Sequence, residues 1–119
     1  MGFQVHTRET CRVLVVEAVG KLTLADGAIK LRDIIHVFAA NGTTRFVLNL
    51  ARVEFIDSYG IGELVRSYSV VRQAGGAMKL AVVNPKVLEV LTISRLNTVF
   101  EIYPDESDAL QAFEQHRFI

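Results

Sequence analysis

Two short and almost continuously apolar runs constrain the fold of this chain more than any other feature. Residues 45–50 (RFVLNL) and 78–83 (MKLAVV) are each typical of a strand that is buried on both faces. The segment between them has apolar residues at spacings of three and four, which predicts an amphipathic helix. The apolar residues of this stripe are Ile61, Leu64, Val65, Tyr68 and Val71. A strand, a helix and a second strand in this order favour a parallel sheet with a right-handed crossover.

The first part of the chain extends this alternation. Residues 3–7 and 12–18 predict two strands that form a hairpin, the second of them rich in β-branched side chains. Gly20 and Lys21 then predict a turn, and Asn41-Gly42 predicts the end of a first helix. The apolar stripe of that helix consists of Leu24, Ala28, Leu31, Ile35 and Phe38. The strand that begins at residue 45 is expected to continue irregularly to residue 56.

The last part of the chain predicts two further helices around one short strand. Asn84 and Pro85 are a typical cap and first residue of a helix, and residues 99–103 predict a strand. Acidic residues mark the start of the final helix, and three apolar residues are expected on its inner face. The acids are Asp105, Glu106 and Asp108, and the inner residues are Ala109, Leu110 and Phe113.

The resulting order is β-β-α-β-α-β-α-β-α. It predicts an α/β fold with a mostly parallel or mixed sheet of about five strands and about four helices, in a single domain of residues 1–119. In such folds, ligand and partner surfaces often lie beyond the carboxyl ends of the strands. Residues 56–60 occupy that position after the strand that begins at residue 45.

Composition narrows the classes of function. The chain has 13 basic and 13 acidic residues and a formal net charge of zero, which gives no basic stripe for nucleic acid. Its apolar runs are too short to span a bilayer, and its start lacks the apolar core of a signal peptide, so we expect a cytoplasmic protein that does not bind membranes. The single Cys11 is expected to be a small buried or edge side chain. His6, His36 and His116 show no ligand spacing, so no metal site is predicted.

The stretch EFIDSYGIGEL, residues 54–64, carries the candidate chemistry. A nucleophilic serine at such a turn lies in a G-x-S-x-G motif, but here Ile56 stands at the place of the leading glycine, and His116 is the only later histidine. Gly60-Ile61-Gly62 matches half of a dinucleotide-binding motif, with Val65 at the third glycine position. Catalysis is therefore disfavoured, and weak nucleotide binding stays a minor alternative.

Helix capping is the plainest role for the polar residues of this stretch. Either Asp57 or Ser58 can cap the helix that follows. Capping requires neither glycine, and each weakens a helix by about 0.5–1 kcal/mol relative to alanine. What Gly60 and Gly62 offer is bare backbone that another protein can approach closely. Tyr59 lies off the apolar stripe and is expected to face solvent as a contact anchor.

These residues resemble the signature of the STAS-domain anti-sigma factor antagonists, a buried strand followed by D-S-x-G-[LI]-G-x-L. The matching residues here are Asp57, Ser58, Tyr59, Gly60, Ile61, Gly62, Glu63 and Leu64. The resemblance covers essentially the whole chain, from the V-G-x-L of residues 19–22 to the pattern of residues 91–102. Thr23 departs from it, because many relatives have an acidic residue at that point.

The resemblance implies a switch rather than an enzyme. In this family the unphosphorylated domain binds an anti-sigma factor that is also a GHKL-type serine kinase, and this binding frees a sigma factor for transcription. The kinase uses ATP to phosphorylate the signature serine, here Ser58, and a PP2C-type phosphatase resets it. The implied partner surface comprises Asp57, Tyr59, Gly60, Ile61, Gly62 and Thr23. No cofactor is expected in this chain, which we expect to be a monomer or weak dimer.

Two rival functions are compatible with the same fold. In a constitutive adaptor, Ser58 would only cap the helix. STAS domains also serve as accessory subunits of signalling or transport complexes.

Overall fold

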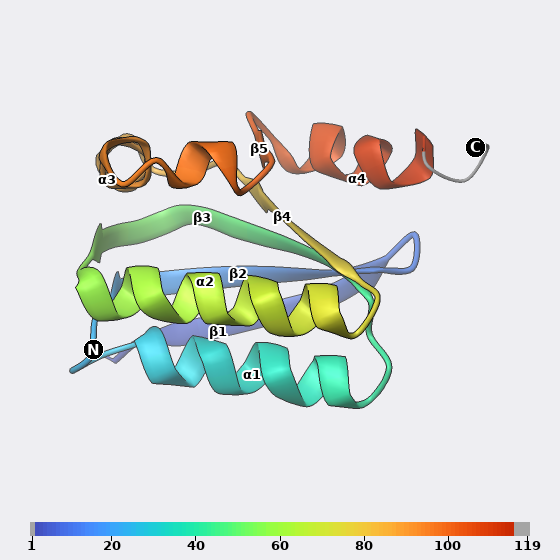
Figure 1. Cartoon of the computed structure of the whole chain (residues 1–119), viewed down its shortest axis with the longest axis horizontal. Coiled ribbons are helices and arrows are strands. Elements are labelled where there is room, and N and C mark those ends of the chain that lie inside the picture. Colours follow the sequence, from blue (N-terminus) through green and yellow to red (C-terminus); the bar gives the residue numbers. More distant parts are fainter. Residues whose placement is uncertain (1, 116–119) are drawn as a thin grey trace.

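The computed structural model describes residues 2–115, which form one five-stranded sheet with helices on both faces (Figure 1). The strands are β1 (Gln4–Thr10), β2 (Val13–Leu22), β3 (Arg45–Ile56), β4 (Ala77–Ala81) and β5 (Ile102–Tyr103). The helices are α1 (Ala28–Ala40), α2 (Ser58–Gln73), α3 (Pro85–Ile93) and α4 (Glu106–Gln115), with a short 3₁₀ helix, η1 (Leu96–Thr98), before β5. The α/β class and the predicted order of elements are confirmed.

The strands lie in the sheet in the order in which they occur in the chain. β1 and β2 pair antiparallel, and β2 to β5 pair parallel. The tight hairpin between β1 and β2 turns at Cys11 and Arg12, which have φ values of 54° and 63°. Two consecutive residues with positive φ match the twist that a two-residue hairpin needs. Cys11 is therefore exposed in this turn, and the prediction of a buried or edge side chain is wrong.

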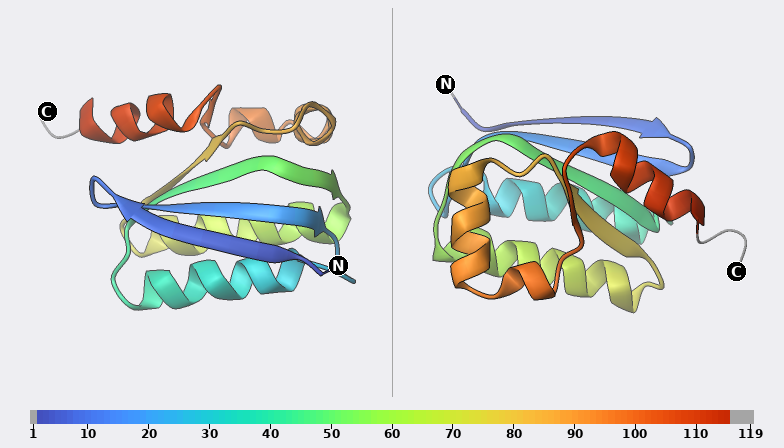
Figure 2. Two further views of the ribbon diagram at one scale, coloured as in Figure 1. Left: turned by 180° about the vertical axis from the view of Figure 1, so that it is seen from behind. Right: turned by 90° about the horizontal axis from the view of Figure 1, so that it is seen from above.

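Helices α1 and α2 lie side by side on one face of the sheet, and α3 and α4 cover the other (Figures 1 and 2). The first part of β3 is buried between these layers, as its apolar run predicted. A large hydrophobic cluster includes Leu31 and Ile35 of α1 and Leu64 of α2. A smaller cluster, which includes Val47 and Phe113, lies under α4. The sheet thus has a packed core on each face.

The end of β2 differs from the sequence-based prediction. Gly20 and Lys21 form no turn, because β2 continues to Leu22 and pairs there with Ile56. The pairing register shifts between Gly20 and Lys21, and Gly20 has a φ of 121°, which glycine adopts without strain. The irregularity that looked like a turn is a bulge within a parallel pair. Leu24 was predicted on the stripe of the first helix, but α1 begins only at Ala28.

Three further predictions are corrected by the structure. Val65 lies on α2 but is 36% exposed, at the edge of the predicted stripe. β4 ends at Ala81, before Val82 with its φ of 53°. β5 comprises only Ile102 and Tyr103, because the Val99 and Phe100 amides both donate to the Leu96 carbonyl oxygen in a turn that follows η1. The predicted cap of α3 is confirmed, since Oδ1 of Asn84 accepts a hydrogen bond of 2.9 Å from the Lys86 amide.

A polar network fastens α4 to the sheet. Oε2 of Glu106 accepts a hydrogen bond of 2.6 Å from Nδ2 of Asn49, and Oε1 pairs with the Arg8 guanidinium. Oδ1 of Asn49 accepts from the Ala51 amide at 2.9 Å. Burial opposes ionisation of Glu106, but the hydrogen bonds from Arg8 and Asn49 and the charge of Arg8 outweigh it and hold the pKa of Glu106 below its ordinary value.

A close approach between α2 and the end of β2 requires a glycine. A Cβ on Gly60 would lie 2.0 Å from the carbonyl oxygen of Leu22 and 2.7 Å from Cγ1 of Ile56. A Cβ on Gly62 would meet nothing within 4 Å. Gly60 is buried, so its role is internal packing, and the expectation that it leaves bare backbone for a partner is corrected. Gly62 is exposed and fits that expectation.

The two glycines predict opposite effects of the same substitution. We expect Gly60→Ala to destabilise the protein by about 1–3 kcal/mol, because the new methyl group meets backbone. Gly62→Ala, its matched control on the same helix, should stabilise it by about 0.5–1 kcal/mol through helix propensity. Urea denaturation measures both, and equal shifts in the two variants would contradict the packing role of Gly60.

The Glu106 network predicts a pH-dependent contribution to stability. The folded pKa lies below the unfolded value of about 4.3, so the contribution is present above that pH and lost as the pH falls through the folded pKa. We expect Glu106→Gln to lower the free energy of unfolding by about 1 kcal/mol at pH 7 and by much less near pH 3. Glu89→Gln on the exposed face of α3 is the control. If the free energies of unfolding of wild type and Glu106→Gln differ by the same amount at every pH, the prediction is contradicted.

Candidate functional site at the start of helix α2

The β2–α1 loop and the start of α2 meet where β2 and β3 end at the same edge of the sheet. The paired ends, Leu22 and Ile56, lead into the β2–α1 loop and into α2. The Asp57 amide donates a hydrogen bond of 3.3 Å to the Leu22 carbonyl oxygen. This bond joins the two segments just beyond the last paired residues of β2 and β3. This is the carboxyl edge of the parallel strands, where sequence placed the site.

Asp57 caps α2 and holds the neighbouring loop. Its backbone is extended, and Oδ1 accepts a hydrogen bond of 2.8 Å from the Gly60 amide. Oδ2 accepts one of 3.2 Å from the Leu24 amide in the β2–α1 loop. A carboxylate at a helix start also interacts favourably with the helix dipole. Of the two capping candidates that the sequence offered, Asp57 therefore takes the role.

Ser58 is the first residue of α2, and its side chain is exposed. Among the residues that the structure describes, no hydrogen bond involves its hydroxyl group. The first internal hydrogen bond of the helix runs from the Ile61 amide to the Asp57 carbonyl oxygen at 3.0 Å. The Ser58 and Tyr59 amides precede that bond and stay available to an anion. A phosphoryl group on Ser58 would meet open solvent and these amides.

Large apolar side chains are exposed around this junction. Leu24, Phe55 and Tyr59, here called the apolar rim, are 50%, 54% and 57% exposed. The prediction that Tyr59 faces solvent is confirmed. Sequence reasoning missed the other two, because Leu24 matched a helical stripe and Phe55 ended an apolar run. No sequence signal separates them from core residues, since their exposure follows from where the loops lie.

The remaining candidates have different surroundings. Thr23 folds the β2–α1 loop into a turn, because its hydroxyl donates to Oδ2 of Asp26 at 2.7 Å and accepts from the Asp26 amide at 3.2 Å. Ile61 is half-buried and packs against the main core. Gly62 is exposed and Gly60 is buried. Tyr59 and Gly62 are thus the exposed positions of the predicted partner surface, whereas Thr23 and Ile61 are partly buried.

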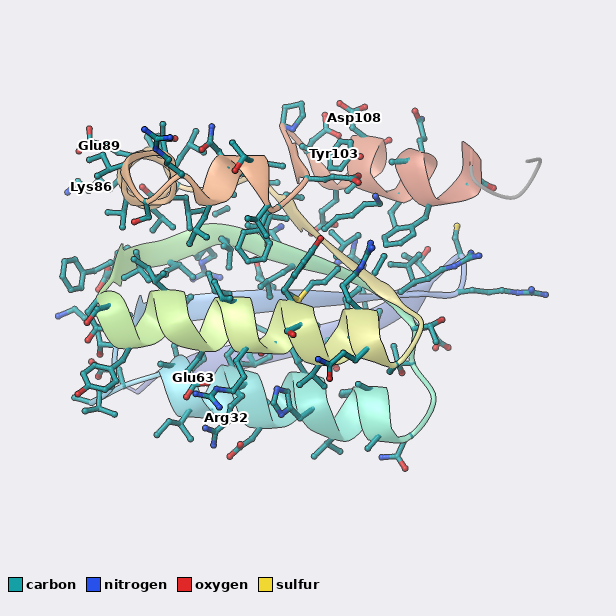
Figure 3. All side chains as sticks on the ribbon, viewed as in Figure 1. Arg32, Glu63, Lys86, Glu89, Tyr103 and Asp108 are labelled. Carbon is teal, nitrogen blue, oxygen red and sulfur yellow. The ribbon has the colours of Figure 1, made fainter. Side chains whose placement is uncertain are left out.

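Glu63, within the same stretch, links the two helices of this face. Figure 3 shows Glu63 of α2 and Arg32 of α1 pointing toward one another, and their ion pair measures 3.0 Å. Arg66, one turn further along α2, pairs with the other carboxylate oxygen at 3.1 Å. The Glu63 side chain is only 17% exposed. It therefore orients α2 against α1, a role that the sequence motif alone did not indicate.

Within residues 2–115, no three His, Cys, Asp or Glu side chains are arranged to hold a metal ion. In the same range, no helix is long and apolar enough to cross a membrane. His116, the one later histidine considered for a catalytic role, lies outside the described residues.

Comparison with known proteins agrees with this geometry. Residues 4–109 match the model of the STAS domain family. The anti-sigma F factor antagonist of Paenibacillus polymyxa is 31% identical to this chain, over 96% of this chain and 97% of the relative.

Two solved structures share the architecture. A crystal structure from Thermotoga maritima superposes with a TM-score of 0.85 at 25% identity and covers 91% of this chain and 92% of the other. An anti-sigma factor antagonist from Mycobacterium paratuberculosis superposes with a TM-score of 0.83 at 24% identity, over 93% of each chain. By its family match, its relative in Paenibacillus and its fold, the chain belongs to the STAS domain family.

Proposed function

We propose that this protein is an anti-sigma factor antagonist whose switch is phosphorylation of Ser58. The observation that carries the proposal is the division of roles between adjacent residues: Asp57 supplies the helix cap, and the exposed Ser58 hydroxyl is left without a structural partner in the described part of the chain. The relative in Paenibacillus, named an anti-sigma F factor antagonist, supports the general role.

The start of α2 suits a phosphoserine. A phosphoryl group adds about −1.5 to −2 charges and three acceptor oxygens. The available amides of Ser58 and Tyr59 and the positive end of the helix dipole favour that charge. Because Asp57 makes the cap, no hydrogen bond of the fold has to break. We infer that phosphorylation leaves the domain folded.

The same charge opposes a partner on this surface. A partner that covers the apolar rim would gain affinity by burying Leu24, Phe55 and Tyr59. Phosphoserine at the centre of that contact would be desolvated next to the Asp57 carboxylate. A loss of about 2.7 kcal/mol lowers affinity about 100-fold. Repulsion and desolvation together are of the size needed to release the partner.

The proposed partner is an anti-sigma factor that is also a GHKL-type serine kinase. It would bind the unphosphorylated protein, transfer a phosphoryl group from its own ATP to Ser58, and release the product. A PP2C-type phosphatase would remove the group. In this cycle the protein acts in the cytoplasm as substrate and switch, without a cofactor or catalysis of its own, and as a monomer or weak dimer.

Binding of the kinase should depend on the charge at Ser58. We expect wild type and Ser58→Ala to capture the kinase from lysate of the source organism, and Ser58→Asp to lose at least about 90% of it. With the captured kinase and ATP, wild type should gain the mass of one phosphoryl group and Ser58→Ala none. All three proteins should unfold at similar temperatures, because Asp57 caps α2 in each.

Equal capture by the three baits would contradict the switch and favour a constitutive adaptor or an accessory subunit of another complex. Hydrolysis of an ester substrate that is abolished by Ser58→Ala would instead favour an enzyme.

The apolar rim predicts where the kinase makes contact. We expect Phe55→Ala and Tyr59→Ala each to weaken its binding at least about tenfold, while stability changes by about 0.5 kcal/mol or less. Val37→Ala is a matched control, because Val37 is 58% exposed but lies on α1 away from the site. Calorimetry with the captured kinase measures the affinities. Equal losses for Val37→Ala, or none for the rim variants, would place the contact elsewhere.

A further inference from the structure

A basic cavity lies at the other end of the sheet from Ser58. It has a volume of about 370 Å³ and is lined by the start of β3, the end of α2, the turn before β4, and residues before β5 and on α4. Ser58 begins α2 and Arg72 lies in its last turn, so the length of the helix separates the two places (Figure 1). The cavity therefore shares no lining residue with the proposed switch site.

Among the residues that the structure describes, three cations from three different elements line this cavity. They are Arg45 of β3, Arg72 of α2 and Lys79 of β4, and within this described lining Glu101 is the one carboxylate. Lys79 is buried and forms an ion pair with Glu101, which compensates its charge. Its ammonium group also lies 4.8 Å from the centre of the Phe113 ring. Lys79 and Glu101 thus form a fixed, nearly neutral wall.

The two arginines supply the excess positive charge. Within residues 2–115, no carboxylate oxygen lies within 4.0 Å of a side-chain nitrogen of Arg45 or Arg72. The Arg72 guanidinium lies 6.0 Å from the centre of the Tyr68 ring, which helps to hold it in place. A guanidinium group presents a planar fork of donors that matches the oxygens of a phosphate.

The backbone at the rim of the cavity leaves room for a ligand. A Cβ on Gly75 would meet nothing within 4 Å, and this residue has a φ of 86°, which favours glycine. A Cβ on Gly76 would lie 2.3 Å from the Thr44 carbonyl oxygen, so this glycine lets the turn approach β3. The Gly75-Gly76 pair does more than end α2, because it also shapes the mouth of the cavity.

We propose that this cavity binds a phosphate dianion, free or as the monoester of a small molecule, between Arg45 and Arg72. Two guanidinium groups that have no carboxylate partner within residues 2–115 match the charge of a dianion. The volume has room for a phosphate with a small organic group attached. The Lys79–Glu101 ion pair stays intact and forms one wall of the site.

Titration with inorganic phosphate, followed by NMR of the amides at constant ionic strength of about 0.15 M, tests the site. We expect saturable shifts at Gly75, Gly76 and Ala77. A variant with Arg45→Gln and Arg72→Gln should bind at least about tenfold more weakly, and each single variant should show part of that loss. Arg52→Gln, on the exposed part of β3, is the control and should bind like wild type.

Two further probes identify the source of the phosphate. Glycerol 3-phosphate that binds more tightly than inorganic phosphate indicates a phosphomonoester, and equal or weaker binding indicates the free ion. Shifts that do not saturate, an equal loss in Arg52→Gln, or equal binding of glycerol alone would overturn the proposal. Spectra of all variants must keep the native dispersion, which separates lost binding from lost fold. Failure here leaves the Ser58 switch untouched.

Discussion

The Asp57 carboxylate ties together the two segments that meet at the carboxyl ends of β2 and β3. One oxygen caps α2 through the Gly60 amide, and the other accepts from the Leu24 amide of the facing loop. Both segments that carry exposed residues of the site are thus positioned by one group at the end of the central strand. Because Asp57 takes the structural role, the phosphorylation of Ser58 that we propose would break no hydrogen bond that the fold needs.

One short stretch serves two purposes because a helix has an inner and an outer face. Gly60 faces inward against the end of β2, and Glu63 turns toward α1 and pairs with Arg32. Tyr59 and Gly62 lie on the outer side. The inward residues set the position of α2, and the outward residues form the surface that we propose for the partner. A substitution in this stretch can therefore change binding, stability or both, depending on the face.

The chain is formally neutral, but within residues 2–115 not every cation has a carboxylate partner. Several ion pairs join elements that are distant in sequence, such as Arg8 with Glu106 and Lys79 with Glu101. Arg45 and Arg72, near the amino ends of the strands, have no carboxylate partner among the described residues. The carboxyl ends carry the proposed switch. The two proposed sites therefore lie at opposite ends of the sheet.

Sequence alone determined the element order, the buried strands, the cap at Asn84 and the location of the candidate site, because periodicity and capping depend on residues that are near one another in the chain. It misplaced the turn at Gly20, which is a bulge that only the pairing with β3 defines. It left the cap of α2 open and missed the exposure of Phe55. The tertiary structure decided these points and the need for glycine at position 60, because each depends on contacts between segments that are distant in sequence.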